Sequence, residues 1–281
     1  MKPTMLRAPR VGWVPVRSVV GVAVILAVGV PPVAYAAAGA GDSATTGERP
    51  ALRNSVTATL KGERVAPGAC EYTSRLKLAP GEQAIREEEV ASDPANCTMT
   101  VRRGTPADAI QSDSAEPRSS RKEGGAAATA GPSGRSPDSA ADQTAAAAVR
   151  SAGYYKSYFE DPVGIDVNSV RNSVDWYWNG SYVYNGYCRY NYGWYSPSGW
   201  GLKENNFFCR YENSQTQVRS SSYVHFKNGV FCFPLDTHTY YERNNAYGKY
   251  NGYLVGQVNW RKTGGCTGLL RFRTELRRTL N

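Results

Sequence analysis

The stretch "VDWYWNGSYVY", residues 174–184, carries five aromatic side chains distributed around the Asn179-Gly180 pair. Asn-Gly accepts a positive φ at both central positions of a two-residue turn, and such turns match the twist of paired strands. We therefore predict a β-hairpin in which Trp176 lies opposite Val183. Since neighbouring residues of a strand point to opposite faces, the hairpin sorts its side chains into two sets.

The two faces of this hairpin differ in character. The face expected to join the core comprises Val174, Trp176, Trp178 and Val183. The opposite face comprises Asp175, Tyr177, Tyr182 and Tyr184. Indole and aliphatic groups suit a core, whereas a phenol can keep its hydroxyl in water, so we expect a strip of tyrosines on the outside of a sheet.

The Asn-Gly pair at 228–229 predicts a second hairpin in "YVHFKNGVFCF", residues 223–233. Its core face would comprise Val224, Phe226, Phe231 and Phe233. Further strands are predicted over 165–170, 206–211, 215–219, 238–242, 253–260 and 267–274. Many short strands separated by turn residues predict an all-β fold, either an antiparallel β-sandwich or a small barrel.

Composition divides the chain into segments. Residues 151–281 hold 17 of the 19 Tyr, 5 of the 6 Trp and all 7 Phe, and we predict that they form a Tyr/Trp-rich all-β domain. Residues 105–150 consist largely of Ala, Ser, Gly, Pro and Asp, with no aromatic residue, and are predicted to form a disordered linker. Residues 53–104 are predicted to form a small β unit held by a disulfide, after a flexible N-terminus at 37–52.

The first 36 residues have the pattern of an export signal. Basic residues precede an apolar run at 19–30, and the small-x-small triplet 34–36 follows a Pro-Pro pair. An apolar run of this length is short for a bilayer span. We therefore predict a signal peptide, a secreted mature chain, and contact with the membrane only during export. The alternative is an uncleaved anchor that continues through the alanines after residue 32.

The cysteines support an oxidising compartment. The six cysteines all follow the predicted signal, and no CxxC pair occurs, so three disulfides are expected rather than a metal site. The linker separates Cys70 and Cys97 from the other cysteines, which predicts that these two pair with each other. The other four are expected to pair with their neighbours in sequence, as Cys188–Cys209 and Cys232–Cys266. The acidic run at 87–89 is expected to lie on a solvated face.

A binding site is the main functional hypothesis. Flat rings beside polar amides suit sugars, which present C–H patches rimmed by hydroxyl groups. The candidate ligand-binding residues are the strip Tyr177, Tyr182 and Tyr184, and Trp194, Tyr195 and Trp200 in a predicted loop at 190–201. The alternative is that Trp194 and Trp200 are core residues anchored by the Cys188–Cys209 disulfide.

A secreted hydrolase is the second hypothesis. Asp236 and His238 share a strand face and could meet, with a serine from 220–222 as a nucleophile. Paired carboxylates, such as Glu160-Asp161 with Asp166 or Asp175, could serve glycoside hydrolysis. The sequence contains no nucleophile elbow, zinc-protease motif or phosphate-binding loop, so we favour a non-catalytic role and expect no cofactor.

The net charge bears on the partner. Residues 151–281 carry 15 Lys and Arg against 9 Asp and Glu, a balance of +6. Secretion and the absence of a large basic cluster argue against nucleic acid. We expect a cell-wall glycan or an anionic surface polymer, such as teichoic acid or an acidic polysaccharide, as the partner of a binding module.

A family resemblance rests on four features of the chain. These are the signal sequence, the Ala/Arg/Gly/Pro-rich bias, and the stretches "LAPGE…ASDPANC…VRRGTP" and "EDPVGIDVNSV…W…NGS…GW…C". The chain resembles uncharacterised secreted proteins of high-GC Gram-positive bacteria (actinobacteria) over most of its length outside the linker. The resemblance implies secretion and disulfides, and it implies no activity, cofactor or site residues.

Overall fold

The computed structural model describes residues 51–108, 121–130 and 148–280. The chain divides into two units, Met1–Thr45 and Thr46–Asn281, and every described residue belongs to the second unit. The predicted signal peptide and almost all of the predicted flexible N-terminus therefore lie outside the described residues, and both remain predictions.

The described chain forms two β-sheets. The first contains, in spatial order, β1 (Leu52–Lys61), β5 (Thr98–Pro106), β4 (Ala84–Asp93), β14 (Arg271–Leu280), β7 (Val149–Glu160), β8 (Asp166–Trp178), β9 (Val183–Tyr195) and β6 (Arg121–Thr129). The second contains β10 (Trp200–Glu212), β11 (Gln217–Cys232), β12 (Leu235–Lys249), β13 (Leu254–Gly264), β3 (Ala69–Leu78) and β2 (Glu63–Ala66). The helical turns are the 3-10 segments η2 (Ser196–Ser198) and η3 (Thr267–Leu269).

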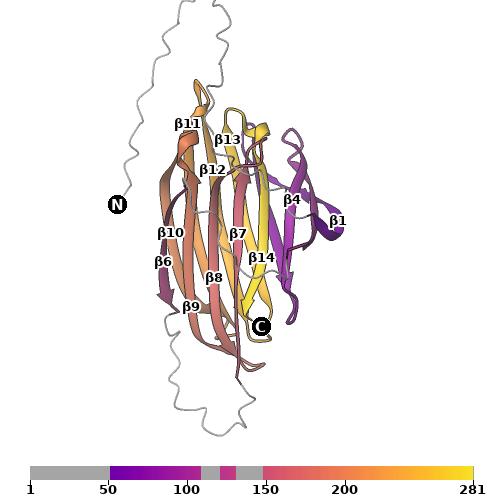
Figure 1. Ribbon diagram of the computed structural model, residues 1–281, viewed down its shortest axis with the longest axis vertical. Coiled ribbons are helices and arrows are strands. Elements are labelled where there is room, and N and C mark those ends of the chain that lie inside the picture. The colour runs from indigo at the N-terminus through magenta and orange to yellow at the C-terminus, as the bar shows by residue number, and fades with distance from the viewer. Residues whose placement is uncertain (1–50, 109–120, 131–147, 281) are drawn as a thin grey trace, which may run out of the picture. The chain divides into compact units, whose positions relative to one another are not determined.

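The two sheets pack face to face as a sandwich, as Figure 1 shows, and within the described residues every pair of neighbouring strands is antiparallel. The predicted all-β sandwich is therefore confirmed. The three predicted disulfides are also confirmed, namely Cys70–Cys97, Cys188–Cys209 and Cys232–Cys266. The Cys188–Cys209 bond joins β9 of the first sheet to β10 of the second, so it links the two layers covalently.

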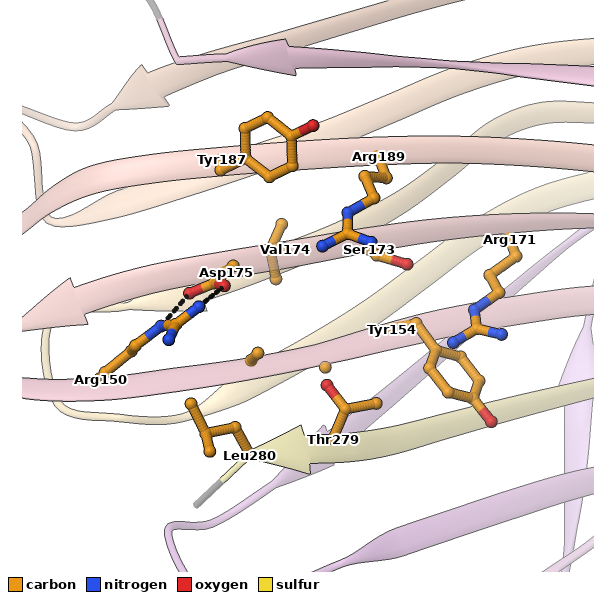
Figure 2. A pocket seen from close by; sticks show the side chains of 12 residues that line it. Arg150, Tyr154, Arg171, Ser173, Val174, Asp175, Tyr187, Arg189, Thr279 and Leu280 are labelled. Atoms are coloured by element: carbon orange, nitrogen blue, oxygen red, sulfur yellow. Dashed lines mark hydrogen bonds and ion pairs between the residues drawn. The ribbon is translucent and has the colours of Figure 1, made fainter. Parts of the chain in front are cut away.

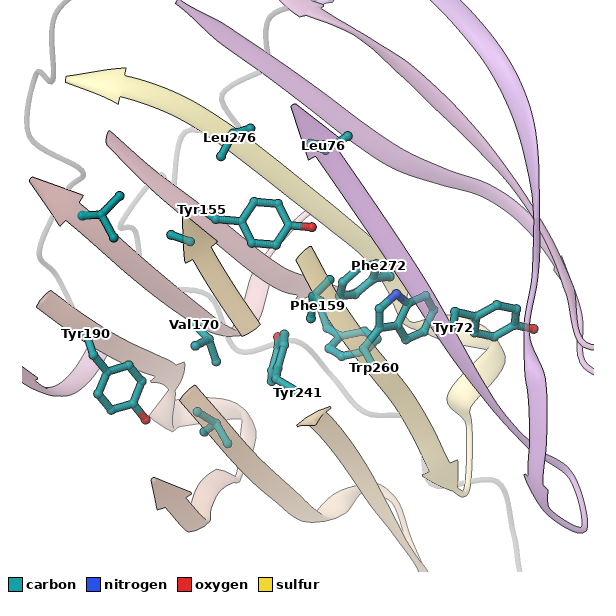
Figure 3. Close-up of a cluster of buried hydrophobic side chains, with 14 of the residues drawn as sticks. Tyr72, Leu76, Tyr155, Phe159, Val170, Tyr190, Tyr241, Trp260, Phe272 and Leu276 are labelled. Carbon is teal, nitrogen blue, oxygen red and sulfur yellow. The ribbon is translucent and has the colours of Figure 1, made fainter. Parts of the chain in front are cut away.

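Aromatic rings fill much of the space between the sheets (Figure 3). The ring centroids of Trp260 and Phe272 lie 4.0 Å apart, and those of Phe159 and Phe272 lie 5.2 Å apart. Tyr72 stacks on Trp260 at 5.0 Å. These rings come from β3, β7, β13 and β14, so the core depends on strands that are far apart in the sequence.

Two glycines in the second sheet make room for large rings from the first. A Cβ on Gly248 of β12 would lie 2.3 Å from the Trp176 ring, and a Cβ on Gly256 of β13 would lie 2.2 Å from the Tyr155 ring. Trp176 and Tyr155 are both fully buried. The glycines therefore act here through their small size, because any side chain would overlap a close-packed ring.

The first predicted hairpin has the predicted faces but a different register. Trp178, rather than Trp176, lies opposite Val183. Asn179 Oδ1 accepts hydrogen bonds from the backbone N–H groups of Ser181 and Tyr182, each at 3.0 Å, and this longer Asx turn replaces the two-residue turn. The register differs by two residues, which preserves the alternation, and the core-facing set points inward as predicted.

The second predicted hairpin reverses later than expected. Asn228 pairs with Thr237 inside the β11–β12 ladder, and the chain reverses at Phe233 and the proline after it. The Asn228 side chain accepts hydrogen bonds from two backbone N–H groups and holds a bulge, so it does not form the turn. Phe226 is buried as predicted, whereas Phe233 is 83 % exposed at the tip, so its placement in the core was wrong.

The segment predicted to be a small separate unit, 53–104, shares both sheets with the C-terminal domain. Its strand β3 pairs with β13 in the second sheet, and β4 pairs with β14 in the first. The structure thus differs from the predicted division. The physical reason is edge pairing, because β13 and β14 would otherwise expose rows of unpaired backbone groups.

The acidic run at 87–89 is buried, in contrast to the solvated face expected from the sequence. Its residues are only 2 % to 8 % exposed. The ion pairs that compensate them are Glu87–Arg103 at 2.5 Å, Glu88–Arg273 at 2.6 Å and Glu89–Lys262 at 3.2 Å. A buried carboxylate is tolerated only with such partners, and these come from β5, β14 and β13.

Part of the predicted disordered linker is ordered. Residues 121–129 form β6, which pairs with β9 at the edge of the first sheet. Glycine suits this edge, because a Cβ on Gly124 would lie 2.3 Å from the Tyr192 hydroxyl and one on Gly125 would lie 2.0 Å from a backbone oxygen. The rest of the predicted linker at 109–120 and 131–147 lies outside the described residues.

Candidate functional site

The six aromatic residues predicted to bind a ligand do not come together. Tyr177 and Tyr184 stack with ring centroids 5.9 Å apart, where β8 ends and β9 begins, and Tyr182 is 38 % exposed in the turn between them. The opposite end of β9 lies roughly 35 Å away along an extended strand. At that end lie the other three, Trp194, Tyr195 and Trp200.

Of the two tryptophans in this second group, Trp200 belongs to the core and Trp194 is partly buried against it. Trp200 is 3 % exposed and packs against Phe231 at 6.3 Å between centroids. Trp194 packs against Phe226 at 6.2 Å. The predicted loop at 190–201 is in fact the end of β9, the helix η2 and the start of β10. The burial of Trp200 agrees with the alternative of a core residue, and Trp194 lies on the inward side of β9 near its end.

The alternative catalytic pair does not form. Asp236 Oδ2 lies 2.5 Å from Lys227 Nζ, and His238 Nδ1 lies 2.9 Å from His225 Nε2. The serines at 220–222 lie farther back along β11, and the side chains of all three form hydrogen bonds with asparagines. The carboxylate therefore neutralises a lysine, and the histidines are not placed beside a nucleophile.

Three of the four carboxylates predicted to serve glycoside hydrolysis pair with cations, and Asp161 accepts hydrogen bonds from the backbone N–H groups of Val163 and Ile165. Glu160 pairs with Arg273, and Asp175 pairs with Arg150. Asp166 lies 3.5 Å from Lys156 Nζ. An acid and a base for hydrolysis need two carboxyl groups with different environments facing one substrate. Fixed ion pairs instead keep these carboxylates in structural roles.

The strands β7, β8 and β9 present a different candidate site on the outer face of the first sheet, shown in Figure 2. Their alternate residues point away from the core and form rows across the three strands. We call this surface the tyrosine–arginine face. It comprises Arg150 and Tyr154 from β7, Arg171, Asp175 and Tyr177 from β8, and Tyr184, Tyr187 and Arg189 from β9.

Cross-strand pairing sets the order of these side chains. Ser173 lies between Tyr154 on β7 and Arg189 on β9. In the next row, Asp175 lies beside Tyr187. The stacked pair of Tyr177 and Tyr184 follows at the end of the face, so the tyrosine strip predicted from the sequence continues into a row of arginines.

A cavity of about 380 Å³ lies on this face. Side chains of the three strands and of Thr279 and Leu280 from β14 line it. Val174 and Gly153 are among the lining residues, together with charged and aromatic groups (Figure 2). A volume of this size is sufficient for one or two sugar rings or a compact anion.

The guanidinium groups on this face are unevenly compensated. Arg150 donates two hydrogen bonds to Asp175, at 3.0 and 2.5 Å, and this carboxylate raises the pKa of Arg150. Arg171 lies over the Tyr154 ring, with Cζ 3.7 Å from the centroid, and Arg189 lies 5.5 Å from the Tyr187 centroid. Within the described residues, neither Arg171 nor Arg189 forms an ion pair. Three arginines against one aspartate leave this face with a charge of +2.

The outer face of the second sheet carries a separate aromatic stack. His225 stacks on Tyr240 with centroids 4.2 Å apart, and Arg261 lies 3.7 Å from the Tyr240 centroid. Burial is the main cause that lowers the pKa of His225 to about 4, and the positive charges of His238 and Arg261 act in the same direction. The ring is therefore neutral near pH 7. His225 lies on the second sheet, so it cannot act as a base in the cavity on the first sheet.

No family model, curated protein or solved structure matches this chain. In the part of the chain that the structure describes, no helix is long and apolar enough to cross a bilayer. Over the same ranges, no three His, Cys, Asp or Glu side chains gather in a way that could hold a metal ion.

Sequence reasoning missed the arginines of the tyrosine–arginine face. A usable signal existed, because Arg171, Ser173, Asp175 and Tyr177 alternate with buried residues along one strand, and Arg189 follows Tyr187 at the same spacing. The predicted hairpin uses this alternation only for the residues that flank the turn. Extending it backwards along β8 and forwards along β9 would have placed the arginines beside the tyrosines.

Proposed function

We propose that this chain is a secreted binding module whose tyrosine–arginine face binds an anionic glycan of the cell surface. The observation that carries the proposal is the position of Arg171 and Arg189. Both stand beside the cavity with an aromatic neighbour, and neither forms an ion pair with a described residue. A cation that the fold leaves uncompensated is available to a ligand.

The chemistry of the face fits an acidic sugar. A guanidinium presents a planar set of donors that matches a carboxylate or a phosphate, and such charge-assisted hydrogen bonds are the strong ones. The rings of Tyr177, Tyr184 and Tyr187 offer flat, electron-rich faces on which the C–H patch of a sugar ring can rest. The hydroxyl of Ser173 lies between these two kinds of group.

The cysteines support the extracellular location. The six cysteines form three disulfides and none is free. Disulfides persist in oxidising compartments and are rare in the cytosol, where thiols are kept reduced. An exported protein would meet anionic polymers of the cell surface directly.

The experiment compares binding of polygalacturonate, a polyanionic glycan, with binding of neutral dextran. The purified full chain should bind the first and ignore the second in affinity electrophoresis. Binding should weaken as salt rises, because ions screen exposed charges. The variant R171Q/R189Q removes two charge-assisted contacts, each worth about 1.5–3 kcal/mol, so its affinity should fall at least about a hundredfold.

The matched control is R53Q/R271Q. Arg53 and Arg271 are exposed residues of the same sheet, away from the tyrosine–arginine face, and the control loses the same net charge. Its affinity should stay within about twofold of the parent, since surface charges far from a site contribute little. An equal loss of affinity in both variants would show that binding depends on net charge alone and would overturn the assigned site. Equal binding of dextran and polygalacturonate would overturn the proposal that the ligand is anionic.

A further inference from the structure

A second cavity lies on the outer face of the other sheet, across β10, β11 and β12. Its volume is about 400 Å³, close to that of the first. It has the same chemical character, with arginines, aromatic rings, and hydroxyl and amide groups. The aromatic and cationic side chains that line it are Phe208, Arg210, Arg219, Tyr223 and Arg243.

Phe208 is an apolar ring in a polar setting. It is 39 % exposed, and the guanidinium carbons of Arg210 and Arg219 lie 4.9 and 4.8 Å from its centroid. In the row across the sheet, Phe208 lies opposite Ser221, which donates a hydrogen bond to Asn245 on β12. The ring of Phe208 is therefore flanked by two guanidinium groups and partly exposed on the polar outer face of the sheet, where a ligand could reach it.

The arginines around this ring are incompletely compensated. Arg210 and Arg219 share one carboxylate, Glu212, each at 2.8 Å. The Nε–H of Arg219 is buried and lacks a hydrogen-bond acceptor among the described residues. Arg243 is exposed and forms no ion pair with any of them. Glu242 does not offset this charge, because it pairs with Arg261 at 2.9 Å.

We propose that this cavity is a second site for the same acidic glycan, so that the module is bivalent and cross-links glycan chains. This inference rests on the proposed function of the tyrosine–arginine face. Phe208 and Tyr223 would support a sugar ring, and Arg219 and Arg243 would hold its carboxylate. The amides of Asn206 and Asn245 would bond to its hydroxyl groups.

The fold places the two cavities on opposite outer faces of the sandwich, so the two sites would bind different parts of a glycan or different glycan chains. Packed sheets lie about 10 Å apart, and each cavity lies on the outer side of its own sheet. A short oligosaccharide on one face cannot reach the other. Long polymer chains bound on both faces would therefore be held together by the protein, and their apparent affinity would exceed that of either site.

The test combines stoichiometry with cross-linking. Trigalacturonate should bind the full chain with two molecules per protein in titration calorimetry. The variants R243Q and R171Q/R189Q should each bind one. Long polygalacturonate should scatter light strongly when mixed with the parent protein, whereas each variant should lose at least about tenfold of that signal while still binding the polymer. Because Arg243 is exposed and unpaired, R243Q should fold normally; F208A provides a second test of the same cavity.

The outcomes separate the two proposals. A stoichiometry of one that R171Q/R189Q abolishes and R243Q and F208A leave unchanged would overturn the second site and leave the first. A stoichiometry of one that R243Q abolishes would overturn the function proposed for the tyrosine–arginine face, and bivalence with it. Two bound molecules without any light scattering would overturn cross-linking.

Discussion

Replacement of Lys262 by methionine should test how the two sheets are held together. Lys262 Nζ on β13 lies 3.2 Å from Glu89 Oε1 on β4, and the two side chains are 10 % and 5 % exposed. Lys262 also donates to the backbone carbonyl of Leu270 at 2.5 Å. The Glu89 carboxylate accepts a hydrogen bond from the backbone N–H of Phe272 at 2.8 Å. This ion pair joins the second sheet to the first.

Methionine retains most of the apolar stem of the lysine and removes only its charge. The Glu89 carboxylate would then be buried without its cation, and breaking a buried pair in this way costs about 3–5 kcal/mol. The double variant E89Q/K262M removes both charges, and its glutamine can still accept the Phe272 hydrogen bond. It should therefore lose only about 1–2 kcal/mol relative to the parent.

The assay is urea unfolding followed by tryptophan fluorescence, with the disulfides intact. A single transition is expected, because residues 52–106 share both sheets with the C-terminal strands. The control is K61M, since Lys61 is exposed, and its stability should stay within about 0.5 kcal/mol of the parent. A loss below about 1 kcal/mol for K262M, or an equal loss for E89Q/K262M, would refute the assigned role of the pair.

Three further predictions concern stability. G256A should lose about 1–3 kcal/mol in urea unfolding, because its Cβ would overlap the Tyr155 ring, and an unchanged midpoint would contradict this packing. The pKa of His225 is about 4 in the folded protein against an ordinary 6.5, so unfolding takes up a proton between these pH values. The neutral ring therefore contributes about 1–2 kcal/mol to the free energy of unfolding above pH 6.5, after allowance for solvent screening, and this contribution is lost as pH falls towards 4. The variant H225Q should flatten this part of the dependence of stability on pH. C70S/C97S should lose about 3–4 kcal/mol, since the bond closes a loop with a sequence separation of 27, and unchanged melting would show that the loop is ordered without it.

The sequence alone determined the features that depend on local pattern. Alternation along 174–184 separated the buried tryptophans from the outward tyrosines, and this separation survived a change of register because the shift was even. Proximity in sequence also predicted the pairs Cys188–Cys209 and Cys232–Cys266. Such features need only neighbouring residues, and the chain between them is short.

Tertiary structure alone decided the features that depend on distant partners. Glu89 is 173 residues from Lys262, so its burial could not be read from an acidic run that is solvated in most proteins. The turn after Trp178 followed the hydrogen bonds of the Asn179 side chain rather than the preference of its dipeptide. Arg171 and Arg189 face the same cavity because β8 and β9 pair in one register, and that register is fixed by the packing of both sheets. Side-chain periodicity assigns a residue to a face, whereas long-range pairing and packing select its neighbours on that face.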